Sequence, residues 1–114
     1  MAMKNKNSGQ WPLENMHGLV SRAVSSLLLH GDPEDIANGF LTLSHVGSDD
    51  QSALVREQAR RWWETVQRLM GPSGEPFIRR AERLTRDDKL ELSNALWELH
   101  CHLDSERWRF YGVE

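Results

Sequence analysis

The stretch from Gln51 to Met70 constrains the fold most, because its apolar residues recur at steps of three and four. The residues at this spacing are Val55, Ala59, Trp62, Val66 and Leu69. Trp63 and Met70 widen the stripe on one side when the segment is projected as a helix. The pattern therefore predicts a helix over residues 51–70 that buries one face.

The opposite side of this predicted helix is polar and carries two pairs of opposite charge. Glu57 precedes Arg61 by four residues, and Glu64 precedes Arg68 by the same step. Pairs in this order stabilise a helix by about 0.2–0.5 kcal/mol each. The following sequence, GPSGEP at residues 71–76, contains the glycines and prolines that end helices. We expect a loop there.

Other segments along the chain also have helical periodicity or helix start signals. The predicted helices are residues 13–30, 33–45, 76–84 and 86–103, and residues 104–112 can add one more turn or two. Asp32 and Pro33 suit the cap and the first turn of the second helix. Thr85 and Asp88 form a capping signature for the helix that follows.

These segments predict an all-α, single-domain bundle of five helices, or six if residues 104–112 form a separate one. Residues 1–10 are polar and predict a flexible N-terminal tail, which leaves residues 11–114 as one helical domain. A chain of 114 residues with 39% hydrophobic and 27% charged residues fits one globular domain with a modest core.

The bulk composition also restricts the compartment and the partners. The formal net charge is −3, so no overall basic field attracts nucleic acid. Cys101 is the single cysteine, which excludes an intrachain disulfide and favours a reducing compartment. No apolar run approaches the length of a membrane span, and the N-terminus lacks the apolar core of a secretory signal. We expect a cytoplasmic protein that does not enter the membrane.

The predicted helix over residues 86–103 has two apolar stripes on almost opposite sides. One consists of Leu92, Ala95, Leu96, Leu99 and Leu103, and the other of Leu90, Trp97 and Cys101. Such a helix is either central, with both sides in the core, or it turns its second stripe toward a partner. Five tryptophans in so short a chain favour the partner, because tryptophan is enriched at interface anchors.

Candidate metal and catalytic patterns are weak. Glu14 and His17 form an ExxH pair, but the second ExxH motif that a bundle di-metal site uses is missing. His100, Cys101 and His102 are adjacent, and neighbours on a helix point about 100° apart, so they do not converge on one ion. Cys101 is therefore expected to be a small buried hydrophobe. No nucleophile elbow or phosphate loop is present, and we expect no catalytic, cofactor or metal site.

A basic stripe offers an alternative function. Arg79, Arg83 and Arg86 lie at helical spacing and could contact an acidic partner or phosphates. A small DNA-binding or nucleoprotein accessory factor would use such a stripe. Asp87 and Asp88 open the next helix, however, and two acids at the start of a recognition helix repel the DNA backbone. Nucleic acid is not the expected partner.

The helix containing Trp62 and Trp63, together with the stripe of Leu90, Trp97 and Cys101, carries a resemblance of architecture. In size and helical layout the chain resembles small antiactivators of the QslA kind, which sequester LuxR-type quorum-sensing transcription factors. The resemblance implies a steric mechanism, in which an apolar helix face occupies the surface that the transcription factor needs for its own dimerisation or for DNA binding. It implies no specific site residues.

The sequence thus favours a non-enzymatic, homodimeric regulatory protein that sequesters a protein partner, such as a transcription factor, through an apolar helix face. The candidate residues of the partner or dimer interface are Leu90, Trp97, Cys101, Trp63 and Met70.

Overall fold

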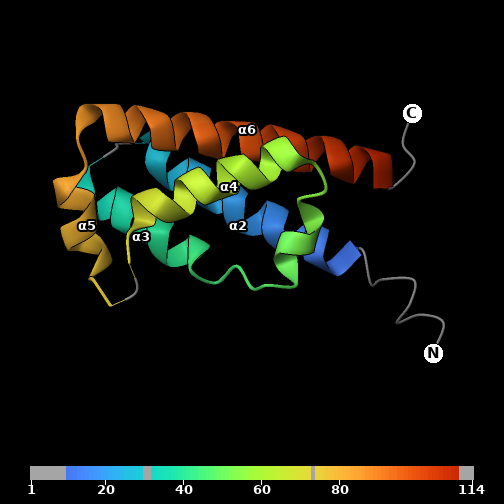
Figure 1. Ribbon diagram of the computed structural model, residues 1–114, viewed down its shortest axis with the longest axis horizontal. Coiled ribbons are helices and arrows are strands. Elements are labelled where there is room, and N and C mark those ends of the chain that lie inside the picture. Colours follow the sequence, from blue (N-terminus) through green and yellow to red (C-terminus); the bar gives the residue numbers. More distant parts are fainter. Residues whose placement is uncertain (1–9, 30–31, 73, 111–114) are drawn as a thin grey trace.

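The described residues of the computed structural model, 10–29, 32–72 and 74–110, form an all-α bundle (Figure 1). Its helices are α2 (Gln10–Leu29), α3 (Pro33–Leu43), α4 (Glu57–Met70), α5 (Phe77–Arg83) and α6 (Arg86–Phe110), with a short 3-10 helix, η1 (Asp50–Ala53). No strand occurs among these residues. The predicted all-α fold is confirmed.

α6 runs along one side of the bundle and is its longest helix, with 25 residues (Figure 1). It packs against both α2 and α4, while α3 packs against α2 and α5. η1 lies against α2. This arrangement gives α6 two supporting neighbours on its inner side and leaves its outer side to solvent.

The core is formed by one face of every α-helix. Its largest fully buried side chains are Met16, Val20, Ile36, Phe40, Leu43, Val66, Leu69, Leu92, Leu96, Leu99 and Leu103. Phe40 of α3 also meets Phe77 of α5 edge to face, with ring centroids 5.9 Å apart. Such a pair stabilises the contact beyond its buried area, by about 0.5–1.5 kcal/mol.

The predicted helix over residues 51–70 is correct only in its second part. The chain forms η1, turns at Leu54 to Arg56 and then begins α4 at Glu57. Ala53 and Leu54 are buried, and Arg60 Nη1 donates to the Leu54 carbonyl at 2.9 Å, which holds the turn. Burial of the turn therefore overrides the helical pattern, and Val55, predicted to be core, is 57% exposed.

Other boundaries also differ from the predictions. α2 begins at Gln10, so this residue belongs to the helix and not to the predicted tail, while residues 1–9 lie outside the described part. α6 continues through residues 104–110, which add the further turns that the sequence allowed after Leu103 and do not form a separate sixth helix. Glu106 pairs with Arg109 at 3.1 Å, and Arg107 pairs with Glu14 of α2 at 3.2 Å, so local and distant ion pairs both support the extended helix. Residues 111 and 112 lie outside the described residues.

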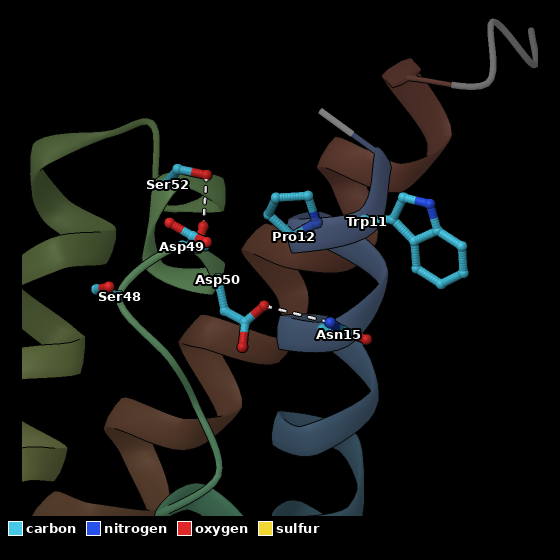
Figure 2. Close-up of a pocket in the computed structure, with 7 residues that line it drawn as sticks. All are labelled: Trp11, Pro12, Asn15, Ser48, Asp49, Asp50 and Ser52. Carbon is cyan, nitrogen blue, oxygen red and sulfur yellow. Dashed lines mark hydrogen bonds between the residues drawn. The ribbon is translucent and has the colours of Figure 1, made fainter. Parts of the chain in front are cut away.

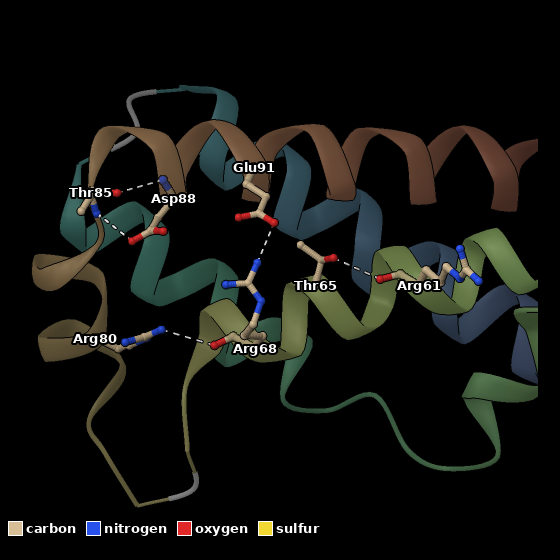
Figure 3. Close-up of polar contacts among 7 residues, drawn as sticks. All are labelled: Arg61, Thr65, Arg68, Arg80, Thr85, Asp88 and Glu91. Atoms are coloured by element: carbon tan, nitrogen blue, oxygen red, sulfur yellow. Dashed lines mark hydrogen bonds and ion pairs between the residues drawn. The ribbon is translucent and has the colours of Figure 1, made fainter.

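Two predicted capping signals are confirmed. Asp32 Oδ1 accepts from the Asp35 backbone N–H at 3.0 Å at the start of α3. Thr85 and Asp88 bond reciprocally before α6, each side chain to the other's backbone N–H at 3.0 Å (Figure 3). The bond from the Thr85 backbone N–H lowers the pKa of the Asp88 carboxyl, because it favours the charged form, and the Thr85 side chain lowers that pKa further. The sequence therefore specifies the start of α6 locally.

Candidate interaction surface on α6

The two apolar stripes predicted on α6 have opposite environments. The inner stripe of Leu92, Ala95, Leu96, Leu99 and Leu103 is buried against the bundle, as predicted. In the outer stripe, Leu90 is 56% exposed, Trp97 is 49% exposed and Cys101 is exposed. The alternative of a central helix buried on both sides is therefore wrong, and so is the expectation that Cys101 is a buried hydrophobe.

Trp108 extends the outer stripe and was missed in the sequence. It is 56% exposed and lies seven residues beyond Cys101, a spacing that returns to the same side of a helix. Projected at 100° per residue, Leu90, Trp97, Cys101 and Trp108 fall within about 40° of one another. At 1.5 Å per residue the stripe is about 27 Å long. The signal was in the sequence, but the predicted helix ended at Leu103.

A histidine pair lies beneath Trp97, between α6 and α2. The Trp97 and His100 rings are stacked, with centroids 5.6 Å apart and planes 16° from parallel. His100 in turn meets His17 of α2, with ring centroids 5.5 Å apart. His17 Nε2 lies 3.4 Å from Asp104 Oδ1, and its side chain is only 16% exposed. The pair fixes one side of Trp97 against the bundle.

The environment of His17 disfavours its protonated form. Burial lowers the pKa of His17, and the positive charge of Arg107 and the neighbouring His100 lower it further. Asp104 acts in the opposite direction and offsets only part of this shift. The folded protein therefore resists protonation of His17 more than the unfolded chain does.

The adjacent histidines and cysteine of α6 point to different surroundings. His102 is buried, with 9% exposure, whereas Cys101 is exposed and His100 lies half-buried against α2. Glu14 of the ExxH pair is bound to Arg107. Within the described part of the chain, no group of three or more His, Cys, Asp or Glu side chains is placed to hold a metal ion.

The two interface candidates on α4 are less accessible than those on α6. Trp63 is 5% exposed and belongs to the core, and Met70 is half-buried and packs against it. Since α4 begins after Val55, its buried face is centred closer to Trp63 than the longer pattern indicated. Trp63 therefore has almost no surface to offer a partner, and the candidate interface is restricted to α6.

The predicted basic stripe is split between α5 and the start of α6. Arg79 and Arg86 are exposed, whereas Arg83 forms an ion pair with Glu75 at 2.9 Å. The neighbouring Arg80 turns inward and donates to the Leu69 carbonyl at 2.9 Å. The stripe therefore presents two arginines without an ion pair among the described residues, on a short helix and a helix start.

Ion pairs on α4 follow the predicted pattern in part. Arg61 pairs with Glu57 at 2.7 Å, as expected from their spacing. Arg68, which we expected to pair with Glu64, instead contacts Glu91 of α6 at 2.6 Å (Figure 3). That contact joins α4 to the edge of the outer stripe, and sequence spacing could not reveal it, because the two residues belong to different helices.

A pocket of about 480 Å³ lies between the start of α2 and the loop before η1 (Figure 2). Its lining residues are Trp11, Pro12, Asn15, Ser48, Asp49, Asp50 and Ser52. Asp50 is already engaged, since its two oxygens accept from Asn15 at 3.4 Å and from the Gly47 N–H at 2.9 Å. Trp11 projects to the other side of α2 from the loop in Figure 2. The polar groups thus fix the loop and do not converge on a ligand.

None of the described helices combines the length and the apolarity needed to cross a bilayer. No protein-family model matches the chain, and no curated protein and no solved structure is significantly similar to it.

Proposed function

We propose that this protein is a non-enzymatic regulator that binds and sequesters a protein partner through the outer stripe of α6. The observation that carries the proposal is the alignment of Leu90, Trp97, Cys101 and Trp108 on the solvent side of a helix whose other side is fully packed. Exposed apolar residues aligned on one side of a helix are typical of interaction sites, because exposure of aromatic side chains to water is costly.

The tryptophans give the stripe most of its binding capacity. A tryptophan side chain buries about 150–250 Å² on full burial, and Trp97 and Trp108 are each about half exposed. Covering the remaining half of one ring, about 100 Å², stabilises a complex by about 2–3 kcal/mol. Tryptophan is also a preferred anchor at interfaces, where a few residues carry most of the binding energy. Support from His100 holds the Trp97 ring in place before binding, which reduces the entropy lost.

A straight apolar stripe on a helix fits the apolar face of a partner helix best. A transcription factor that dimerises through such a helix is the partner class we favour. Covering its dimerisation helix would remove the dimer that reads DNA, so that the regulator acts sterically and needs no catalytic group. The resemblance in size and helical layout to antiactivators of quorum-sensing regulators agrees with this mechanism.

The test uses the full chain as bait in extracts of its native host. The wild-type bait and a Trp97→Ala bait are compared, with Trp11→Ala as the matched control, since Trp11 is 63% exposed on α2. We expect a transcription factor to be captured by wild type and Trp11→Ala and to be lost with Trp97→Ala. Titration of the purified protein should then release that factor from its operator in a gel-shift assay. Equal capture by the Trp97→Ala bait, or an operator complex that persists, would contradict the proposal.

A further inference from the structure

The two edges of the outer stripe carry opposite charge in the first half of α6. Arg86 and Lys89 lie on the edge that faces α2, and Asp87, Glu91 and Glu98 lie on the edge that faces α4. The neighbouring helices fix these assignments: further along the first edge, Arg107 is bound to Glu14 of α2, while Glu91 on the second edge contacts Arg68 of α4 (Figure 3). The stripe is thus apolar along its centre, basic on one side and acidic on the other.

Several of these charges remain unpaired within the chain. Arg86, Lys89, Asp87 and Glu98 form no ion pair with any of the residues that the structure describes. Four charges of two signs, two on each edge, are therefore free to pair across an interface. Charge arranged in this way fixes the orientation of a partner more than it adds affinity.

The order of signs on the two edges is reversed toward the C-terminal end of α6. There Asp104 lies on the edge that faces α2, and Arg109 lies on the edge that faces α4. Arg107, the additional cation of the first edge, is bound to Glu14 at 3.2 Å. At both ends of the stripe, the charges on one edge therefore lie at a similar height along the helix to charges of opposite sign on the other edge.

We infer that the surface which fits this pattern is a second copy of the chain, with the two α6 helices parallel and related by a two-fold axis along them. In such a dimer the α2-side edge of one copy meets the α4-side edge of the other, on both sides of the stripe. Arg86 and Lys89 then face Asp87 and Glu91 of the second copy, and Asp104 faces Arg109. In an antiparallel dimer that lays Leu90 over Trp108, each edge meets the opposite end of the same edge. Asp87 and Glu91 then face Arg109, but Lys89 lies level with Arg107, so that only one of the two edges is complementary.

The size of the surface sets the strength of this dimer. A stable interface buries about 800 Å² on each partner, and the half-exposed tryptophans contribute only about 100 Å² each. The stripe forms the apolar centre and the two edges form the polar rim, an anatomy that suits an interface of small to standard size. We expect a dimer whose population depends on protein concentration. A partner helix with the same pattern of charges can therefore replace the second copy. The inference rests on the proposed function in this respect: the second copy covers the outer stripe until the partner binds.

Exchanging the charges of one edge provides the main test. Arg86→Glu/Lys89→Glu makes both edges acidic, and Asp87→Lys/Glu98→Lys makes both edges basic; neither disrupts an ion pair of the described chain. We expect each variant alone to be monomeric by sedimentation at concentrations where the wild type is dimeric, and an equimolar mixture to form a one-to-one heterodimer. Circular-dichroism melts establish that both variants fold. Variants that dimerise alone as the wild type does, or a wild type that is monomeric at every concentration, would overturn the inference.

Orientation is tested with a single cysteine at the end of the stripe. In Leu90→Cys/Cys101→Ser, a parallel dimer places the two thiols side by side, whereas an antiparallel one separates them by about 27 Å along the helices. A short bismaleimide should link the parallel dimer rapidly, and a second variant, Leu41→Cys/Cys101→Ser, which has its thiol on the exposed side of α3, should not be linked. Absence of a link at position 90 would contradict the parallel arrangement.

These measurements use the purified protein alone and are independent of partner capture. A monomer that still captures a transcription factor through Trp97 would overturn the dimer and leave the proposed function standing. A charge-dependent dimer that captures no factor would overturn the proposed function and leave the dimer standing.

Discussion

Arg80 closes the C-terminal end of α4 through the carbonyl of Leu69. Its Nε donates to that oxygen at 2.9 Å, and its Nη2 donates to the Arg68 carbonyl at 3.3 Å (Figure 3). Carbonyls in the last turn of a helix have no partner within the helix, and they carry the negative end of the helix dipole. The guanidinium of α5 therefore caps α4 and joins the two helices across the loop.

Removing this cap should destabilise the protein. We expect Arg80→Ala to lower the free energy of unfolding by about 1–2 kcal/mol, because hydrogen bonds from a charged group are lost. Arg80→Lys should retain only part of the stability, since an ammonium cannot reach both carbonyls with fixed fork geometry. Arg79→Ala is the matched control on the same helix and should have little effect. Urea titrations of the three variants measure the differences; equal values for positions 79 and 80 would contradict the capping role.

Gly71 and Gly18 should respond in opposite directions to replacement by alanine. Gly71 has φ 85°, and a Cβ there would lie 2.9 Å from Cδ of Arg80, so Gly71→Ala combines backbone strain with a displaced cap. Gly18 lies within α2, and a Cβ there meets nothing within 4 Å. We expect Gly71→Ala to destabilise by more than about 1 kcal/mol and Gly18→Ala to stabilise by about 0.5–1 kcal/mol. Thermal unfolding of both variants measures whether each substitution lowers or raises the stability.

Replacement by alanine also distinguishes a tryptophan of the core from a tryptophan of the surface. Trp63→Ala should cost about 3–5 kcal/mol, because it removes a large buried side chain. Trp97→Ala should change the stability of the monomer far less, because half of the ring already faces water. Denaturant unfolding at low protein concentration, where self-association is absent, makes the comparison. Comparable losses for both variants would place Trp97 in the core and remove it from the interface.

The sequence predicted those features of the fold that depend on a few neighbouring residues. Caps such as Asp32 and Thr85 were recognised because each motif spans only a few residues. The start of α4 was missed, because burial of Leu54 in the core stops the helix, and periodicity carries no information about that burial. Pairs between helices, such as Arg68 with Glu91, likewise depend on the tertiary arrangement.

Three residues of the candidate site could be predicted from the sequence, because they belong to one helix. Leu90, Trp97 and Cys101 were located because an apolar residue opposite a complete core stripe is visible in a helical projection. Their exposure was not predictable, since the number of helices around α6 is a tertiary property. The stack of His100 on Trp97 and its contact with His17 also joins two helices, and only the structure brings these rings together.

Two histidines with lowered pKa values, His17 and His102, predict how stability responds to pH. The pKa of His17 is lowered in the folded state, mainly by burial, and burial lowers the pKa of His102 as well. Below the unfolded value of about 6.5, the unfolded chain binds protons that the folded chain resists, so acid favours unfolding. The stability contributed by the neutral histidines is therefore complete above that pH and is lost as the pH falls toward the lowered values.

Replacement of one histidine should reduce this dependence. We expect the free energy of unfolding of the wild type to decrease between pH 7 and pH 5, with a maximum slope of about 1.4 kcal/mol per pH unit for each proton taken up. His17→Gln should have a smaller slope, and His17→Gln/His102→Gln a smaller one still, since each removes a group that the unfolded state protonates more readily. Urea titrations at a series of pH values measure the slopes. A His17→Gln variant with the wild-type slope would contradict the lowered pKa of His17, and a steeper slope would show that its contact with Asp104 outweighs burial and Arg107.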